Sequence, residues 1–303
     1  VSDKLLFNRE SNKIINVNMI SNNQKYYMSP LEITNKIELI IPLEKHYVAM
    51  NPSIIKTDDG YIVNFRSSNF GLKPGGVYYC RSPDNIINTI NYILELDKNL
   101  NVTKISEVLD KSKTKIYPRS NIKGLEDLII FKRKEELWGT CTLLDVNEKG
   151  IPQIGLCKLD FLDDKNIYVI NTKKAFKFIE KDRCEKNWLP FVHEDELKLI
   201  CGYSPTQIRI PIETIDDHAE TKIIKNHNTE LDYSRFRGSA SPIPFEINSD
   251  NSPISTTIEI NSPISTTIEI GWLIVVHEVS WNADKSRVYT HRFVYMNKDF
   301  EIK

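Results

Sequence analysis

An all-β fold is what this sequence predicts, on three observations. First, one unit recurs four times: a short polar cluster leads into an apolar strand, a turn and a second apolar strand. Second, apolar and polar residues alternate with a period of two through most of the chain, which is typical of strands with one buried face. Third, no long amphipathic helix is apparent after residue 50. Hairpins repeated at intervals of roughly 50 to 75 residues indicate the blades of a β-propeller.

The four predicted hairpins follow one another along the chain. Their paired strands are 51–55 with 61–66, 124–131 with 137–140, 185–191 with 197–203, and 236–242 with 272–278. Further alternating segments extend these units, at 76–81, 93–97, 155–160, 167–170 and 288–295. Residues 58–60 and 132–136 have the composition of hairpin turns.

This count predicts about four blades. The sequence ends directly after a strand, so we expect a fifth blade to be missing or incomplete. Residues 1–45 are rich in Asn and Lys and are interpreted as an N-terminal leader or packing segment, with the propeller domain over 46–303. The decamer 251–260 is repeated without change at 261–270, inside the fourth hairpin, and a surface loop is expected there because loops accept insertions at little cost.

Composition limits the partners. The net charge is −1 and the pI is about 6.7, which gives no general attraction for nucleic acid. No apolar run is long enough for a membrane span. The five cysteines have no metal-type spacing, so reduced thiols and a cytoplasmic location are expected, with neither metal nor other cofactor. Oligomeric state is left open.

In a propeller every blade begins beside the central axis, so polar clusters far apart in sequence would converge there. The predicted catalytic group is Asp127, because a carboxylate flanked by apolar residues at the start of an inner strand suits a general acid. A solvated acidic pair, Glu126 and Asp127, is the alternative interpretation. The residues predicted to bind substrate are Asn51, Arg66, Glu126, Lys186, Asn187, Trp188, Arg237, His277, Tyr289 and His291.

Trp188 and His277 each have a structural alternative. Trp188 suits stacking on a sugar ring, although a core position is the more common one for Trp. His277 ends an apolar strand and is either a core histidine or one that faces a ligand. Tyr289 and His291 are expected to share a face because they are two residues apart in a strand, with Arg292 on the opposite face. One acid with several cations suits a substrate that carries phosphate better than a two-carboxylate hydrolase.

The run Gly124-Leu125-Glu126-Asp127 resembles the Gly-x-Glu-Asp motif of the five-bladed propeller mannoside phosphorylases of glycoside hydrolase family 130 and the related β-1,2-mannosyltransferases. The resemblance implies that Asp127 is the general acid/base and that basic residues of other blades hold phosphate. Asn51, Lys186-Asn187, Arg237 and His277 are similar to other motif positions. The family usually has Pro-Arg after Glu-Asp, whereas this chain has Leu128-Ile129.

Three kinds of function remain open at this stage. The first is an enzyme that transfers a mannosyl-like residue to or from phosphate, a sugar phosphate or a sugar acceptor. The second is a non-catalytic carbohydrate-binding propeller, and the third is a scaffold that binds protein at its rim. Cysteine catalysis through Cys184 is a further option that lacks a positioned histidine in the sequence.

Overall fold

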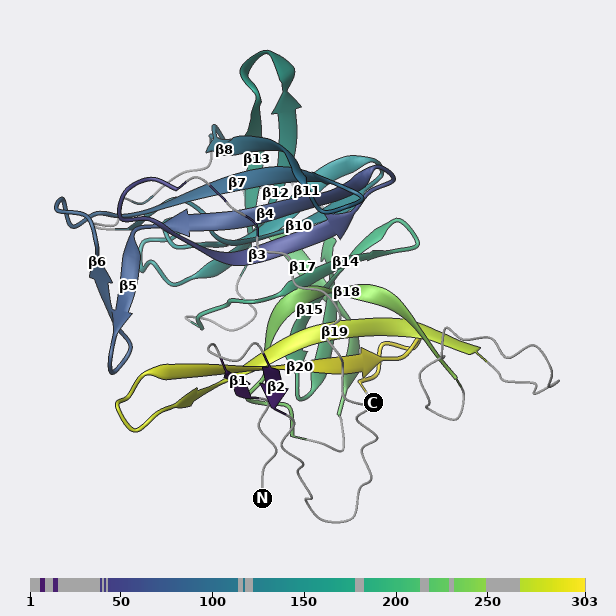
Figure 1. Ribbon diagram of the computed structural model, residues 1–303. Helices are drawn as coiled ribbons and strands as arrows, with labels where there is room; N and C mark the ends of the chain where they lie inside the picture. The colour runs from purple at the N-terminus through teal and green to yellow at the C-terminus, as the bar shows by residue number, and fades with distance from the viewer. Residues whose placement is uncertain are drawn as a thin grey trace.

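The computed structural model describes residues 6–8, 13–15, 39, 41, 43–113, 117, 122–177, 183–212, 218–228, 232–248 and 268–302. Within these ranges the protein is built of strands, with one 3-10 turn, η1 (Asp163–Lys165), and no α-helix (Figure 1). The predicted all-β fold is therefore confirmed. No helix in the described part is long and apolar enough to cross a membrane.

The strands form four successive antiparallel sheets, which we call blades one to four. Blade one is β3 (Val48–Lys56), β4 (Gly60–Ser68), β7 (Ile87–Asp97) and β8 (Val102–Asp110). Blade two is β10 (Glu126–Arg133), β11 (Glu136–Leu143), β12 (Gln153–Leu162) and β13 (Ile167–Phe176). Blade three is β14 (Leu189–His193), β15 (Glu196–Tyr203), β16 (Thr206–Ile212) and β17 (His218–His227). Blade four is β18 (Arg237–Asn248), β19 (Ile268–Trp281) and β20 (Arg287–Met296).

Smaller strands lie outside this series. The hairpin of β5 (Phe70–Lys73) and β6 (Val77–Cys80) projects from blade one between β4 and β7. The short β9 (Ile122–Lys123) pairs with β7. Near the N-terminus, β1 (Leu6–Asn8) pairs with β2 (Lys13–Ile15). The rest of the predicted N-terminal segment is described only at residues 39, 41 and 43–45, and the repeated decamers only at Ile268–Ile270 in β19.

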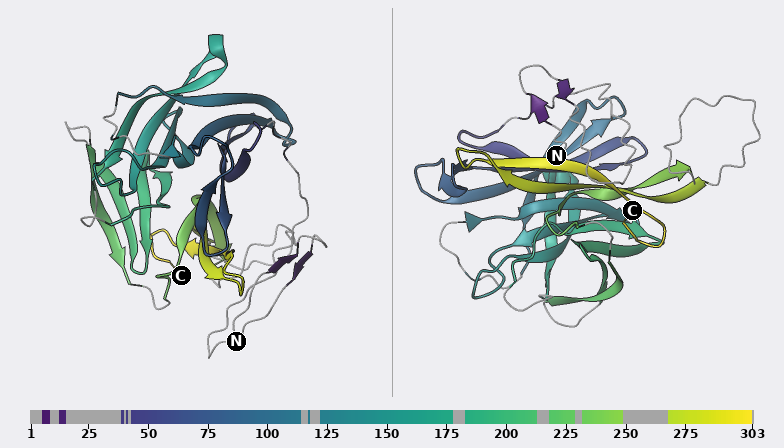
Figure 2. Two further views of the ribbon diagram at one scale, coloured as in Figure 1. Left: turned by 90° about the vertical axis from the view of Figure 1, so that its left-hand side faces the viewer. Right: turned by 90° about the horizontal axis from the view of Figure 1, so that it is seen from below.

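The blades are arranged as a propeller requires. The first strand of each blade contacts the first strand of the next, in the order β3, β10, β14, β18. The side view shows the four sheets following one another around a common centre (Figure 2). At the outside, β13 pairs in parallel with β8 near its first residues and with β17 near its last. Among the described residues there is no fifth sheet of this size.

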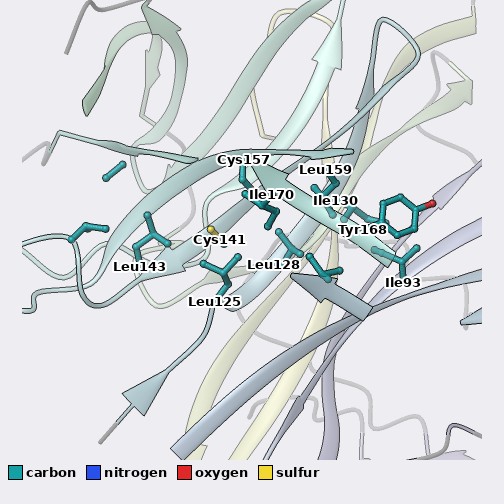
Figure 3. Packing of buried hydrophobic residues seen from close by; sticks show 13 residues of the cluster. Ile93, Leu125, Leu128, Ile130, Cys141, Leu143, Cys157, Leu159, Tyr168 and Ile170 are labelled. Carbon is teal, nitrogen blue, oxygen red and sulfur yellow. The ribbon is translucent and has the colours of Figure 1, made fainter. Parts of the chain in front are cut away.

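Apolar side chains fill the spaces between successive blades. One cluster joins Ile93 of blade one to Leu128, Ile130 and other residues of blade two (Figure 3). A second joins blades two and three, and a third joins blades three and four. Face-to-face packing of this kind explains why the strands read as alternating patterns with one or two apolar faces.

Polar side chains fasten the inner strands of blades one and two to each other. Ser53 Oγ donates to the Leu128 carbonyl at 3.2 Å and accepts from the Ile130 amide at 3.1 Å. Asn64 Nδ2 donates to the same Leu128 carbonyl at 2.8 Å. These bonds satisfy the Leu128 carbonyl and the Ile130 amide of β10. They also fix the position of β10 along its length relative to β3 and β4.

We expect Leu128→Ala to destabilise the fold by about 2–5 kcal/mol, because Leu128 is fully buried between blades one and two. Its matched control is Ile54→Ala on the neighbouring inner strand, where the side chain is 56% exposed and the expected change lies within about 0.5 kcal/mol. Urea denaturation measures both changes. Equal changes for the two variants would contradict the packing described.

Candidate functional site

The two carboxylates of the sequence motif point to the same side of β10. Successive residues of a regular strand point to opposite faces. Here the ladder between β10 and β11 shifts register between Glu126 and Ile129, and Asp127 has φ 51°, in the left-handed region that Asp tolerates better than most residues. This bulge brings both acidic side chains to one partner, Arg66 of β4.

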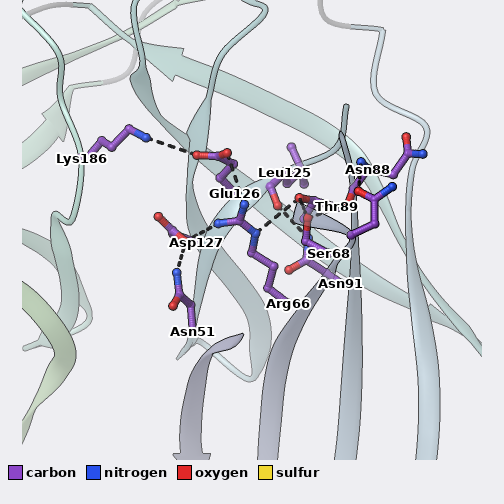
Figure 4. Close-up of polar contacts among 11 residues, drawn as sticks. Asn51, Arg66, Ser68, Asn88, Thr89, Asn91, Leu125, Glu126, Asp127 and Lys186 are labelled. Carbon is purple, nitrogen blue, oxygen red and sulfur yellow. Dashed lines mark hydrogen bonds and ion pairs between the residues drawn. The ribbon is translucent and has the colours of Figure 1, made fainter. Parts of the chain in front are cut away.

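Arg66 is the buried centre of the site. Its Nη1 lies 2.8 Å from Asp127 Oδ1 and its Nη2 lies 3.3 Å from Glu126 Oε1 (Figure 4). Nε donates to Thr89 Oγ1 at 3.3 Å. A buried guanidinium is costly unless it is paired, and these two carboxylates supply the pairing.

Lys186, just before β14, brings blade three into the same cluster. Its Nζ lies 3.2 Å from Glu126 Oε2, so both oxygens of Glu126 are held by cations. Burial lowers the pKa of Lys186, but the charges of Glu126 and Asp127 outweigh burial and the pKa is raised. The Lys186 side chain stays 34% exposed and can still meet solvent or a ligand.

Asp127 is the less constrained carboxylate. Asn51 Nδ2 and Arg66 Nη1 both donate to Oδ1. Within the described part of the chain no donor reaches Oδ2, and the side chain is 20% exposed. A substrate atom can therefore approach Oδ2.

The glycine of the motif allows the strand to start where it does. Gly124 has φ +92°, and a Cβ there would lie 2.1 Å from the Thr89 carbonyl oxygen of β7. Only glycine permits this approach of β10 to blade one, which brings the carboxylates to Arg66. Asn91 Nδ2, also from β7, donates to the Leu125 carbonyl at 3.0 Å and holds the same turn.

Blade four contributes a second cluster around His277. Ser239 Oγ and His277 Nδ1 are 2.7 Å apart, and the His277 ring lies 5.7 Å from Tyr289 and 5.9 Å from His291. Tyr289 and His291 therefore share a face, as predicted, while Arg292 pairs with Glu278 on the opposite face at 2.9 Å.

Burial, then His291 and Arg237, lower the pKa of His277, and the charge of Asp127 opposes them. His277 is therefore close enough to Asp127 for the two charges to interact, although their blades are not neighbours in sequence.

Of the predicted site residues, the structure joins Asn51, Arg66, Glu126, Asp127 and Lys186 by direct contacts. It groups His277, Tyr289 and His291 separately. Arg237 is exposed, and its Nη1 donates to the carbonyls of Ser234 and Phe236 at 3.0 and 2.8 Å, not to a carboxylate. Asn187, beside Lys186, adopts φ 61°.

One predicted position is wrong. Trp188 is only 3% exposed and stacks on Phe176, with ring centroids 5.9 Å apart, in the cluster between blades two and three. A sugar ring has no access to it. The physical reason is that the strand turns inward directly after Asn187, which sends Trp188 into the interblade core.

Sequence reasoning missed the residues that support Arg66. Thr89 accepts from Arg66 and lies 3.4 Å from Ser68 Oγ, and Asn64 and Asn91 hold the β10 backbone. A signal existed in the run Asn64–Asn69, which is fully buried and mostly polar. Buried polar residues at this density need partners. Those of Asn64 and Arg66 lie in the next blade, whereas Ser68 and Asn69 bond to residues 82–88 of blade one.

No cluster of three or more metal-ligating side chains occurs in the part of the chain that the structure describes. All five cysteines are free thiols. The groups that the described residues offer for chemistry are one accessible carboxylate, two nearby cations and a pair of histidines.

No protein-family model and no curated protein matches this chain. Among solved structures, an α-L-arabinofuranosidase from Lactobacillus brevis is 9% identical, covering 84% of this chain and 74% of that chain, with a TM-score of 0.40. A GH43 β-1,3-galactosidase with galactodeoxynojirimycin is 10% identical over 86% of this chain and 75% of its own, with a TM-score of 0.41. At these values the likeness does not bear on substrate or reaction. The resemblance to family 130 stays a prediction.

We expect Arg66→Met to cost about 3–5 kcal/mol of stability, because it leaves two partly buried carboxylates without their shared cation. The control is Lys132→Met, which removes an exposed pair with Glu135 and should cost at most about 1 kcal/mol. Adding Asp127→Asn to Arg66→Met should recover part of the loss. Urea denaturation that finds Arg66→Met as mild as the control would refute the role of Arg66.

The imidazole of His277 should titrate below the ordinary value of 6.5, and NMR of its ring protons measures this. Asp127→Asn should lower the pKa further and His291→Ala should raise it. The unfolded chain binds the proton more tightly, so this group reduces stability as pH falls from 6.5 through its folded pKa. Asp195→Asn, an exposed change elsewhere, serves as the control. A His277 pKa that ignores Asp127 would contradict the proximity of the two clusters.

Proposed function

We propose that this protein is a carbohydrate-active enzyme that transfers a glycosyl residue, mannosyl-like, to or from phosphate, a sugar phosphate or a sugar acceptor, with Asp127 as general acid/base. The observation that carries the proposal is the asymmetry of Asp127. Its Oδ1 is fixed by Arg66 and Asn51, whereas its Oδ2 accepts no bond from the described residues. A positioned carboxyl with one free oxygen is what proton transfer to a glycosidic oxygen requires.

The proposed step balances as follows. In the direction of cleavage, protonated Asp127 donates its proton to the glycosidic oxygen as the bond from that oxygen to the anomeric carbon breaks. An oxygen of phosphate or of an acceptor sugar forms the new bond to the anomeric carbon. In the reverse direction the Asp127 carboxylate removes the proton of the acceptor hydroxyl.

The state of Glu126 favours transfer over ordinary hydrolysis. Hydrolysis by the common route needs two working carboxylates, one as acid and one as base or nucleophile. Both oxygens of Glu126 are already paired with Arg66 and Lys186. Within the described cluster this leaves Asp127 as the accessible acid, and a nucleophile that arrives as an anion does not need a second carboxylate.

The cations divide into two kinds. Arg66 is buried and committed to the carboxylates, so its role is to position them. Lys186 is partly exposed and Arg237 is exposed, and both are proposed to hold an anionic group of the substrate. His277 has a lowered pKa and is therefore neutral near pH 7, which suits hydrogen bonding to a sugar hydroxyl.

A second candidate is a carbohydrate-binding propeller without turnover. The observation that favours it is the 2.8 Å ion pair between Asp127 and Arg66, which commits one oxygen of this carboxylate to a contact within the protein. In this candidate the protein still binds sugar, and the role of Asp127 is to stabilise the fold by pairing with Arg66.

The test is Asp127→Asn. The amide keeps the shape of the carboxyl but cannot deliver or take up a proton, so turnover should fall by ~10²–10⁴-fold while sugar binding stays nearly unchanged. Phosphate release and consumption are measured with a panel of sugar phosphates, nucleotide sugars and manno-oligosaccharides.

The matched control is Asp195→Asn, which makes the same change at an exposed turn residue that also has a positive φ. Its activity should equal that of the wild type. Full activity of Asp127→Asn would remove Asp127 from the mechanism. Wild-type binding of sugar without any turnover would favour the second candidate.

A further inference from the structure

Two hairpins from opposite ends of the chain meet beside the candidate site. The turn between β5 and β6, from blade one, touches the turn between β19 and β20, from blade four (Figure 1). The Gly75 amide donates to the Lys285 carbonyl at 2.8 Å. At Gly76, which has φ +73°, a Cβ would lie 3.0 Å from the ring of Trp281. The positive φ of Gly76 favours glycine, and a side chain there would crowd the side chains of Trp281 and Arg287.

Aromatic rings and one cation cover the place where the hairpins meet. The Arg287 guanidinium lies 5.9 Å from the centre of the Tyr78 ring and 5.4 Å from that of Trp281. Its Nη1 also lies 3.5 Å from the Tyr289 hydroxyl. These contacts bring three rings, from β6, β19 and β20, around one cation.

These rings are exposed, which core packing does not explain. Tyr78 is 56% exposed, Trp281 53% and Tyr289 46%. By contrast Trp188 and Trp272 are buried. A contiguous group of exposed aromatic residues marks an interaction site more often than single exposed apolar residues do.

The aromatic group is continuous with the candidate site in two directions. On the blade-one side, Arg66 lies 5.2 Å from the centre of the Phe70 ring, and Phe70 lies 5.4 Å from Tyr78. On the blade-four side, Tyr289 lies 5.7 Å from His277. A ligand that reaches from Asp127 along this rim would therefore meet these rings.

We propose that Tyr78, Trp281, Tyr289 and Arg287 form a subsite for a remote sugar ring of an oligosaccharide whose reacting end lies at Asp127. In that respect the subsite rests on the proposed function. A pyranose ring has an apolar C–H face that packs on aromatic rings and hydroxyls at its edge that bond to Arg and Tyr donors. The rings here carry polar tips and a cation, which fits an amphipathic sugar better than a purely apolar partner.

The proposal makes binding depend on chain length. A monosaccharide occupies the Asp127 end alone, whereas a tetrasaccharide also reaches the rings. Trp281→Ala should therefore weaken tetrasaccharide binding about tenfold and leave monosaccharide binding unchanged. Trp281→Phe keeps a ring and should retain most of the affinity. The control is Phe293→Ala on the same hairpin, which removes a ring that is equally exposed (54%) but six residues along β20 from Arg287.

Binding is measured by calorimetry in the Asp127→Asn background, so that turnover does not enter. The probes are mannose, β-1,2-mannotetraose, β-1,4-mannotetraose, cellotetraose and xylotetraose. Loss of tetrasaccharide affinity in Trp281→Ala, with retention in Trp281→Phe and Phe293→Ala, supports the subsite. Equal affinities for all variants, or no tetrasaccharide that binds more tightly than mannose, overturns it.

The two proposals fail separately. If Trp281 governs tetrasaccharide binding but the wild type turns nothing over, the subsite stands and the transfer reaction falls. If the wild type is active and Trp281→Ala keeps its KM for long substrates, the transfer reaction stands and the subsite falls. If the aromatic rings instead hold a second copy of the chain, Trp281→Ala changes the mass in light scattering and not sugar affinity, which also overturns the subsite.

Discussion

The guanidinium of Arg66 has to be paired, and much of the site follows from that requirement. It is buried between blades one and two, where an unpaired cation would cost several kcal/mol. Glu126 and Asp127 each pair one carboxylate oxygen with this guanidinium. To do so, two successive residues of one strand must point the same way, and the bulge at Asp127 makes this possible. Lys186 then binds the second oxygen of Glu126 and brings blade three into the same cluster.

The left-handed backbone conformation of Asp127 recurs in two other blades. Asn51 and Asp127 lie within the first four residues of β3 and β10, Asn187 lies just before β14, and all three have φ between 48° and 61°. Asn and Asp adopt this conformation at lower cost than other residues with a side chain. The fold therefore offers three similar positions beside the axis, and this chain places a carboxylate at one of them. At the fourth, the ladder shifts near Gly238, and Ser239 pairs with His277 instead.

Burial and charge divide the polar residues into those that hold the site and those that face solvent. Arg66, Thr89 and Asn91 are buried and bonded to the protein. Asp127, Lys186 and His277 are only partly buried, and their charges act on one another across three blades. The rim formed by the β5–β6 and β19–β20 turns continues this partly exposed group with aromatic rings. A rigid buried layer under an accessible polar layer is the arrangement that positions reactive groups without closing them to a ligand.

The sequence by itself determined the strands, the four hairpins and the place of the acidic pair Glu126-Asp127 at the start of a first strand. Alternation of apolar residues gives strands, and residues 134–135 form the tight turn expected between β10 and β11, both with positive φ. Tertiary structure alone decided which side chains meet, because contacts across blades join residues about 60 apart that no local pattern connects. Trp188 illustrates the difference: its position in the motif suggested a ligand contact, but its direction depends on the packing of blades two and three, which buries it against Phe176. The meeting of Gly76 with Trp281 is likewise invisible in the sequence, since only the closure of blade one against blade four brings those two turns together.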